Sequence, residues 1–262
     1  MKCIKASYPI DWETVNLYTL ADLHLGDPRC NRAHVDAQIK RIADDPHGLC
    51  VLNGDLLNTA LRNSVSDVYG EILRPIDQIV ELVTLLSPIK DRIIGATIGN
   101  HEARVYRNDG IDIMRLACRE LGIEDKYHPD GVLVFLRFGK ANGHARHKDD
   151  NPRQLFTIYA THGSGAGRKE GAKAIRLADM AAIVNCDVYI HAHSHLPMIM
   201  KESSWRVNSG NSSATQVDML FVNTGASLEH GGYGQQQEFK PNSMETPVIH
   251  LNAYKARATA TL

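Results

Sequence analysis

The sequence predicts an α/β protein whose first part alternates strands with helices and whose end is rich in strands. Short apolar runs typical of buried strands recur along the chain, and segments with apolar residues at helical spacing separate the early ones. After residue 186 the expected elements are strands joined by polar loops. No internal repeat, low-complexity tract or linker divides the chain, so we expect residues 1–262 to form one domain without a separate cap domain.

The early part of the chain is expected to contain three strands and three helical segments. Pro75 lies inside the second helical segment, and we expect it to kink that helix or divide it in two, because proline lacks an N–H and clashes with the preceding turn. The expected strands are 15–23, 49–55 and 91–100, and the expected helices are 33–44, 66–86 and 110–121.

The later part is expected to contain one helix, 169–182, among several strands. Two polar segments, 139–153 and 229–247, are either solvated loops or sources of substrate contacts, since long connections often carry function. The strands are expected at 131–138, 154–163, 186–195, 198–205, 218–225 and 247–254.

The composition excludes several classes of protein. A chain of 262 residues, 43% hydrophobic and 23% charged, is long enough to bury a substantial core. Its net charge of −1 offers no electrostatic argument for a nucleic-acid or membrane partner. The five cysteines are scattered without CxxC spacing, and no apolar stretch has the length of a signal-peptide core or a membrane span. We therefore expect a cytoplasmic protein with no membrane partner.

Five polar clusters stand where predicted apolar strands end: DLH at 22–24, GDLLN at 54–58, GNHE at 99–102, THG at 161–163 and HSH at 193–195. The carboxyl ends of strands in an α/β sheet form one rim, so we expect these clusters to converge. Asp22 and His24 lie two residues apart and would point the same way on a strand. The candidate site residues are Asp22, His24, Asp55, Asn100, His101, His162, His193 and His195.

This mixture of carboxylate, imidazole and amide groups predicts a metal site. It suits divalent Mn, Fe, Zn, Co or Ni, whereas calcium prefers oxygen ligands alone and structural zinc favours thiolates. Eight groups are too many for one ion but suit two. We expect two divalent metal ions as cofactors, with Mn²⁺ as the first choice.

In their order along the chain, the clusters resemble the motifs of the calcineurin-like metallophosphoesterase superfamily: D-x-H, GD-x-x-D/N, GNH-D/E, a lone His and GH-x-H. The resemblance covers residues 20–197 and implies a four-layer αββα sandwich of two mixed β-sheets flanked by helices. It also implies that a metal-bridging hydroxide is the nucleophile and that His101 is the catalytic histidine, which protonates the leaving oxygen or stabilises the phosphoryl charge. It implies one metal on Asp22, His24 and His195, a second on Asn100, His162 and His193, and a bridge at Asp55.

Three positions either differ from the common family pattern or distinguish one subgroup of the family from another. Ala192 replaces a common glycine, and Glu102 follows the pattern of the protein phosphatases. Asn58 stands where those phosphatases carry an aspartate that orients the catalytic histidine, and its amide is expected to accept from the His101 imidazole. The phosphatases' DRG element after the bridging aspartate is absent, which counts against a protein phosphatase.

The resemblance therefore favours a phosphodiesterase acting on a nucleotide or a nucleic acid, with a nuclease as the leading subtype. The alternatives are a phosphomonoesterase for a small molecule or a phosphoprotein, and a non-catalytic scaffold. Arg29 and Arg168 are the candidates for substrate contacts. For Arg29 a solvated charge is the simpler interpretation, and for Arg168 the alternative is a flexible turn before a helix. The oligomeric state stays open.

Overall fold

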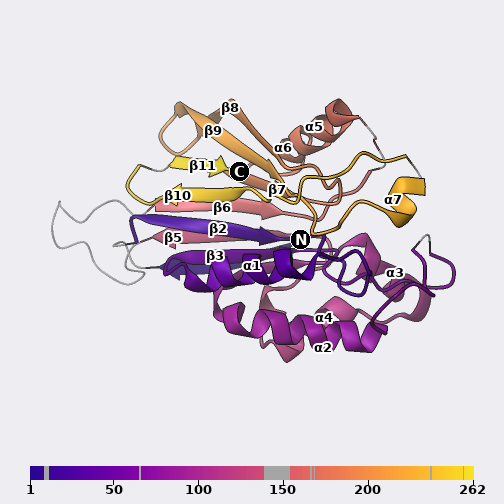
Figure 1. Cartoon of the computed structure of the whole chain (residues 1–262). Coiled ribbons are helices and arrows are strands. Elements are labelled where there is room, and N and C mark those ends of the chain that lie inside the picture. Colours follow the sequence, from indigo (N-terminus) through magenta and orange to yellow (C-terminus); the bar gives the residue numbers. More distant parts are fainter. Residues whose placement is uncertain are drawn as a thin grey trace.

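The computed structural model describes residues 1–262 except 9–11, 65, 139–153, 166, 168, 237 and 256. In this part of the chain two mixed β-sheets pack face to face, and helices cover the outer surface of each (Figure 1). The predicted four-layer αββα sandwich is therefore confirmed.

The larger sheet has six strands in the order β1-β5-β6-β7-β9-β8. Neighbouring strands are antiparallel in the pairs β5–β6 and β8–β9 and parallel in the others. On its outer face, Leu177 and Met180 from the helices α5 and α6 pack against Tyr189 and Phe221 of the sheet. The strands are β1 Lys2–Tyr8, β5 Val132–Phe138, β6 Gln154–Ala160, β7 Val188–His191, β8 Met198–Asn208 and β9 Ser213–Asn223, and the helices are α5 Glu170–Ala178 and α6 Met180–Ile183.

The smaller sheet has five strands in the order β11-β10-β2-β3-β4, of which β2, β3 and β4 are parallel. Three helices, α1, α2 and α4, cover its outer face, on the side of the molecule opposite α5 and α6 (Figure 1). The strands are β2 Thr14–Leu20, β3 Gly48–Asn53, β4 Ile93–Thr97, β10 Val248–Asn252 and β11 Arg257–Thr261, and the helices are α1 Arg32–Asp44, α2 Pro75–Leu86 and α4 Ile113–Glu120.

The central strands are apolar on both faces because both faces are covered. In β2, Leu17 points into the layer between the two sheets, whereas Tyr18 and Leu20 pack beneath the helices. All six residues of β3 are buried. A strand of this kind reads as a continuous apolar run, which is why the sequence pattern located β2 and β3.

Two predicted helices have different bounds in the structure. The helix expected at 169–182 is divided into α5 and α6. The helix expected at 66–86 begins only at Pro75, which occupies its first turn, and Arg74 is its extended N-cap residue. Proline is well placed there because its missing N–H would have no partner in the first turn. Residues 66–74 therefore do not form the first half of a helix, and the proline marks a start rather than a kink.

The helix α3, Asn100–Asp109, was not predicted, because residues up to Asn100 were expected to be strand. Its sequence is polar and buries only Glu102 and Val105, so apolar periodicity is nearly absent. The short elements β1, β11, α7 Gly232–Gln236, η1 Ser87–Arg92 and η2 Glu124–Lys126 were not predicted either. Among the described residues, no helix combines the length and apolar character needed to cross a bilayer.

Candidate metal centre

The five polar clusters gather beyond the carboxyl ends of five strands. Each begins one or two residues after its strand has ended, so the expected convergence at one rim is found. The strands concerned are β2, β3 and β4 of the smaller sheet and β6 and β7 of the larger one. Both sheets therefore contribute side chains to one site.

Left-handed backbone conformations, rather than strand alternation, direct five of these side chains, whereas Asn100 and His101 project from the first turn of α3. The strand β2 ends at Leu20, so the expectation that Asp22 and His24 share a strand face was wrong. Non-glycine residues rarely adopt positive φ, and such conformations concentrate at functional sites, where the surrounding structure holds them. The φ angles are 51° at Asp22, 52° at His24, 50° at Asp55, 64° at His193 and 53° at His195.

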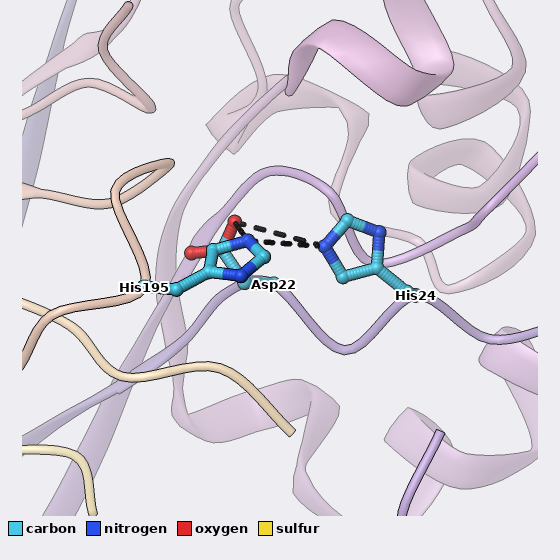
Figure 2. A group of neighbouring side chains, drawn as sticks. All are labelled: Asp22, His24 and His195. Atoms are coloured by element: carbon cyan, nitrogen blue, oxygen red, sulfur yellow. Dashed lines mark hydrogen bonds and ion pairs between the residues drawn. The ribbon is translucent and has the colours of Figure 1, made fainter. Parts of the chain in front are cut away.

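One group of candidate ligands consists of Asp22, His24 and His195, whose ligand atoms all lie within 4.8 Å of one another (Figure 2). Asp22 Oδ1 is 3.2 Å from Nε2 of His195 and 3.9 Å from Nε2 of His24. This carboxylate oxygen is buried and has no hydrogen-bond partner in the described part of the chain. A buried, unpaired carboxylate oxygen facing two imidazole nitrogens fits a divalent cation, because a cation offsets its desolvation.

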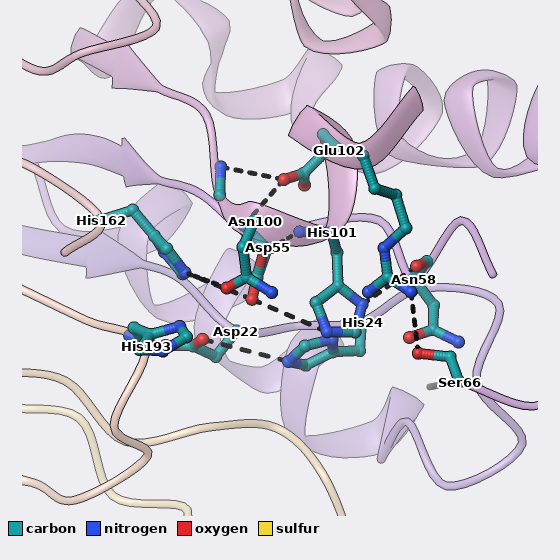
Figure 3. Close-up of polar contacts among 12 residues, drawn as sticks. Asp22, His24, Asp55, Asn58, Ser66, Asn100, His101, Glu102, His162 and His193 are labelled. Atoms are coloured by element: carbon teal, nitrogen blue, oxygen red, sulfur yellow. Dashed lines mark hydrogen bonds and ion pairs between the residues drawn. The ribbon is translucent and has the colours of Figure 1, made fainter. Parts of the chain in front are cut away.

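A second group consists of Asp55, His162 and His193, again with ligand atoms within 4.8 Å of one another (Figure 3). His162 Nε2 lies 3.2 Å from Asp55 Oδ2 and 3.2 Å from Asn100 Oδ1. The structure therefore brings Asn100, from the start of α3, next to His162, one of the two residues with which the sequence resemblance grouped it.

His24, Asp55 and His101 form a third group that connects the other two. Asp55 belongs to two of the groups, which is the arrangement expected of a residue between two ions. His101 Nε2 is 3.9 Å from Asp55 Oδ2, and its ring lies edge-on to that of His24 with the centroids 4.4 Å apart. His101 thus lies at the edge of the cluster with its Nε2 directed inward (Figure 3).

Backbone carbonyl groups orient two of the histidines. Nδ1 of His162 lies 2.8 Å from the carbonyl oxygen of Asn53, and Nδ1 of His101 lies 3.0 Å from that of Asn58. A carbonyl can only accept, so each Nδ1 carries the proton and each Nε2 is left free to face the cluster. The chain fold itself therefore selects the tautomer that a metal ligand or a proton-transfer group needs.

The expected contact of the Asn58 side chain with His101 was wrong. The main-chain carbonyl of Asn58 accepts from the His101 imidazole, whereas the side-chain amide of Asn58 donates to Glu71 Oε1 at 3.0 Å. Glu71 also accepts from the backbone N–H of Ala60 and from the Gln78 amide. Motif matching did not find Glu71, because its role depends on the path of residues 59–74 rather than on a spacing pattern.

Glu102 is fully buried below the cluster and accepts from three backbone N–H groups, those of Asp55, Leu57 and Gly99. Burial and the nearby Asp55 carboxylate raise the pKa of Glu102 to about 7. The three N–H donors favour the ionised form, and a cation at Asp55 would favour it further.

The charges of the cluster are mutually dependent. Burial alone would raise the pKa of Asp55, but the neighbouring His162 and His101 hold that pKa well below its ordinary value. Burial alone would lower the pKa of His162, yet the Asp55 carboxylate raises it to about 10. Burial is the main cause of the lowered pKa values of His24, His101 and His193. The site therefore favours a positive charge beside Asp55 and disfavours further protons on the surrounding imidazoles.

Of the two candidate arginines, Arg29 lies among the described residues. Arg29 packs against the backbone of residues 231–232, where a Cβ on Gly232 would overlap its guanidinium, and it lies beside Asp27. Arg168 and the segment 139–153 lie outside the described residues. The segment 229–247 reaches the site through Asn242, whose amide nitrogen is 3.4 Å from His195 Nδ1.

Comparisons with known proteins give matches among solved structures alone. No protein-family model and no curated protein matches this sequence. A conserved uncharacterised protein from Streptococcus pneumoniae TIGR4, described as a predicted phosphoesterase, is similar over 95% of this chain and 97% of its own, with 13% identity and a TM-score of 0.35. Zinc-complexed wild-type Vps29 from Entamoeba histolytica (10% identity, TM-score 0.35) and a single mutant of it (12%, 0.40) each match 94% of this chain and 97% of their own.

The fold class of this protein follows from its own sheets, helices and polar clusters. Two mixed sheets form a sandwich between helical layers, and five clusters in the order D-x-H, GD, GNHE, H and H-x-H meet at one rim. This is the metallophosphoesterase fold that the sequence resemblance implied.

Proposed function

We propose that this protein is a dinuclear-metal phosphoesterase and that it hydrolyses a phosphodiester of a nucleotide or nucleic acid. The observation that carries the proposal is the meeting of three ligand groups that share His24 and Asp55. Surface histidines and carboxylates gather in exposed, hydrated clusters, but here Asp22, His24, Asp55 and His162 are almost completely buried. Burying so many ionisable groups together is costly unless cations compensate.

The residues present divide naturally between two ions. Asp22, His24 and His195 would hold one, Asn100, His162 and His193 the other, and Asp55 would lie between them. Divalent ions in such a site lower the pKa of bound water and neutralise phosphate charge. Mn²⁺ is the first candidate, and Fe, Zn, Co and Ni suit the same mixture of nitrogen and oxygen ligands.

His101 is the residue that we propose for proton transfer. Its Nδ1 donates to the Asn58 carbonyl, so the ring is held with Nε2 towards Asp55 and the cluster. A protonated Nε2 there donates to the leaving-group oxygen as the ester bond breaks, and a neutral one accepts a proton from the incoming nucleophile. The Asn58 carbonyl orients the ring, and burial keeps the pKa of His101 below its ordinary value even though the Asp55 carboxylate and this hydrogen bond act to raise it.

A phosphodiester is favoured because the chain lacks the DRG element of protein phosphatases after Asp55. The alternative is a phosphomonoesterase that acts on a small molecule or a phosphoprotein. A non-catalytic scaffold is a third possibility, but loss of ligands or of the catalytic histidine would be its mark, and this chain has every ligand type together with His101.

The direct test compares bis-p-nitrophenyl phosphate with p-nitrophenyl phosphate, each with added Mn²⁺ and with EDTA. We expect Mn²⁺-dependent hydrolysis of the diester that the chelator abolishes. Hydrolysis of the monoester alone would replace the diesterase with a monoesterase, and inactivity on both with every candidate metal would favour the scaffold. A panel of nucleotides, cyclic nucleotides, single- and double-stranded DNA and RNA then identifies the substrate class.

A further inference from the structure

We propose that Arg104 contacts a non-bridging oxygen of the substrate's phosphoryl group, next to His101. This inference rests on the proposed function and adds to it a substrate-contacting residue from α3. The turn that carries Asp55, residues 54–60, contains no basic side chain, so a cation for the phosphate must come from another element.

Arg104 lies on the same face of α3 as His101. The two residues are three apart in a helix, a spacing that makes their side chains neighbours. Because His101 points into the cluster, Arg104 is directed along the border of the same site. No signal in the motif GNHE itself marks this residue, which follows the motif by two positions.

One hydrogen bond fixes the position of the guanidinium: Arg104 Nη1 donates to Ser66 Oγ at 3.0 Å. Ser66 lies on the Asn58 side of His101, away from His162 and His193 (Figure 3). Burial lowers the pKa of His101 and the charge of Arg104 lowers it further, so the guanidinium is near that ring, while Arg104 belongs to none of the three ligand groups. A phosphoryl group that reaches His101 from the cluster would meet it next.

The guanidinium has few partners for a half-buried charge. It offers five N–H donors and forms no close ion pair within the described part of the chain, although the more distant carboxylates of Asp55, Glu102 and Glu71 act on its charge. None of its nitrogens is among the fully buried polar atoms that lack a partner in this part of the chain, so its remaining donors keep some solvent exposure. A planar, partly desolvated fork of donors open to solvent is suited to phosphate oxygens.

Other cations near the site already have partners. Lys173 donates to the carbonyl of Ser194 at 2.8 Å, and Lys240 pairs with Glu170. Arg29 is packed against residues 231–232. Lys173, Lys240 and Arg29 are thus less available than Arg104 to a phosphoryl group beside His101.

The test measures binding of inorganic phosphate to the Mn²⁺-loaded protein by isothermal titration calorimetry. Arg104→Met is expected to weaken phosphate binding at least about tenfold, since charged hydrogen bonds contribute on this scale. Arg107→Met is the matched control, because it removes the same charge from an exposed position of the same helix. Metal content, measured by mass spectrometry, should be equal in all three proteins.

Two results would overturn the inference: unchanged phosphate affinity in Arg104→Met, or an equal loss in Arg107→Met, which would indicate a general field rather than a contact. If Arg104→Met does not fold, Arg104→Gln keeps a donor for Ser66 and carries the same test. Failure of wild-type protein to bind phosphate would also overturn it. If instead wild-type protein binds phosphate through Arg104 but hydrolyses neither nitrophenyl ester, only the proposed hydrolytic function fails.

Discussion

The carboxylate of Glu102 accepts a hydrogen bond at 3.0 Å from the backbone N–H of Asp55, a residue 47 positions earlier in the chain. The same side chain accepts from Leu57 at 2.9 Å and from Gly99 at 3.0 Å. One buried carboxylate thus connects the turn after β3 to the first turn of α3. The position of Asp55 relative to Asn100 and His101 depends on this connection.

Replacing Glu102 by glutamine should therefore loosen the candidate metal centre. The amide keeps one acceptor but directs N–H donors at backbone N–H groups, so we expect a loss of about 2 kcal/mol in unfolding free energy and weaker Mn²⁺ binding. Urea denaturation and metal titration measure the two effects. Glu120→Gln, at an exposed position of α4, is the control. Equal stability of the two variants would contradict the bridging role.

Asp55→Asn should lose metal. The substitution keeps the shape of the side chain but removes the charge shared by two ligand groups, beside His162 and His101. After incubation with Mn²⁺ and gel filtration, elemental analysis should find clearly less metal per chain than in wild-type protein. Asp91→Asn changes an exposed aspartate and should retain wild-type occupancy. Full occupancy in Asp55→Asn would remove Asp55 from the ligand set.

His101→Ala separates proton transfer from metal binding. If His101 donates a proton to the leaving group, the variant should keep its metal but lose a factor of about 100 to 10,000 in kcat. Steady-state kinetics on the nitrophenyl diester measure the loss of turnover, and metal analysis shows whether the metal is retained. Loss of metal in this variant would instead make His101 a ligand, which its place in the group with His24 and Asp55 also permits.

The raised pKa of His162 predicts a pH dependence. Its pKa is about 10 in the metal-free protein against an ordinary 6.5, because the Asp55 carboxylate outweighs burial. A folded-state pKa above the unfolded value stabilises the fold fully below pH 6.5, and this contribution is lost as pH rises through about 10. The metal-free protein should therefore lose thermal stability over that range.

Metal binding requires the neutral imidazole, so at about pH 8 Mn²⁺ should displace a proton from His162. Calorimetry in two buffers of different ionisation enthalpy counts the protons released. His162→Asn should release about one fewer, whereas His230→Asn, at an exposed histidine, should behave as wild type. Equal proton release in wild-type protein and His162→Asn would show that His162 is not the group that titrates.

Sequence patterns predicted the parts of this fold that depend on continuous apolar segments. β2, β3 and the central strands of the larger sheet are such segments because both of their faces are covered. β1 was missed because it lies at a sheet edge and fully buries only Ile4. α3 was missed because its exposed face leaves almost no apolar periodicity.

For the candidate site, too, the sequence predicted some features and missed others. Motif order located the residues that converge, since their chemistry is visible in one-letter code. The contacts of Glu71, Arg104 and Asn242 were not visible, because each depends on a loop or helix face that approaches from a distant part of the chain. The assignment of Asn58 went wrong because a backbone carbonyl, which every residue has, makes the contact expected of its side chain. The ligand roles themselves stay predictions.

Gly54 and Gly99 show how closely the two central turns fit. A Cβ on Gly54 would collide with the backbone of Gly99, and one on Gly99 would collide with Asp55. Neither glycine can therefore gain a side chain while the other turn stays in place, so a substitution in one turn requires a change in the other. A designer who transplants this centre into another scaffold would have to move both turns as one module, with β3 and β4 still in register.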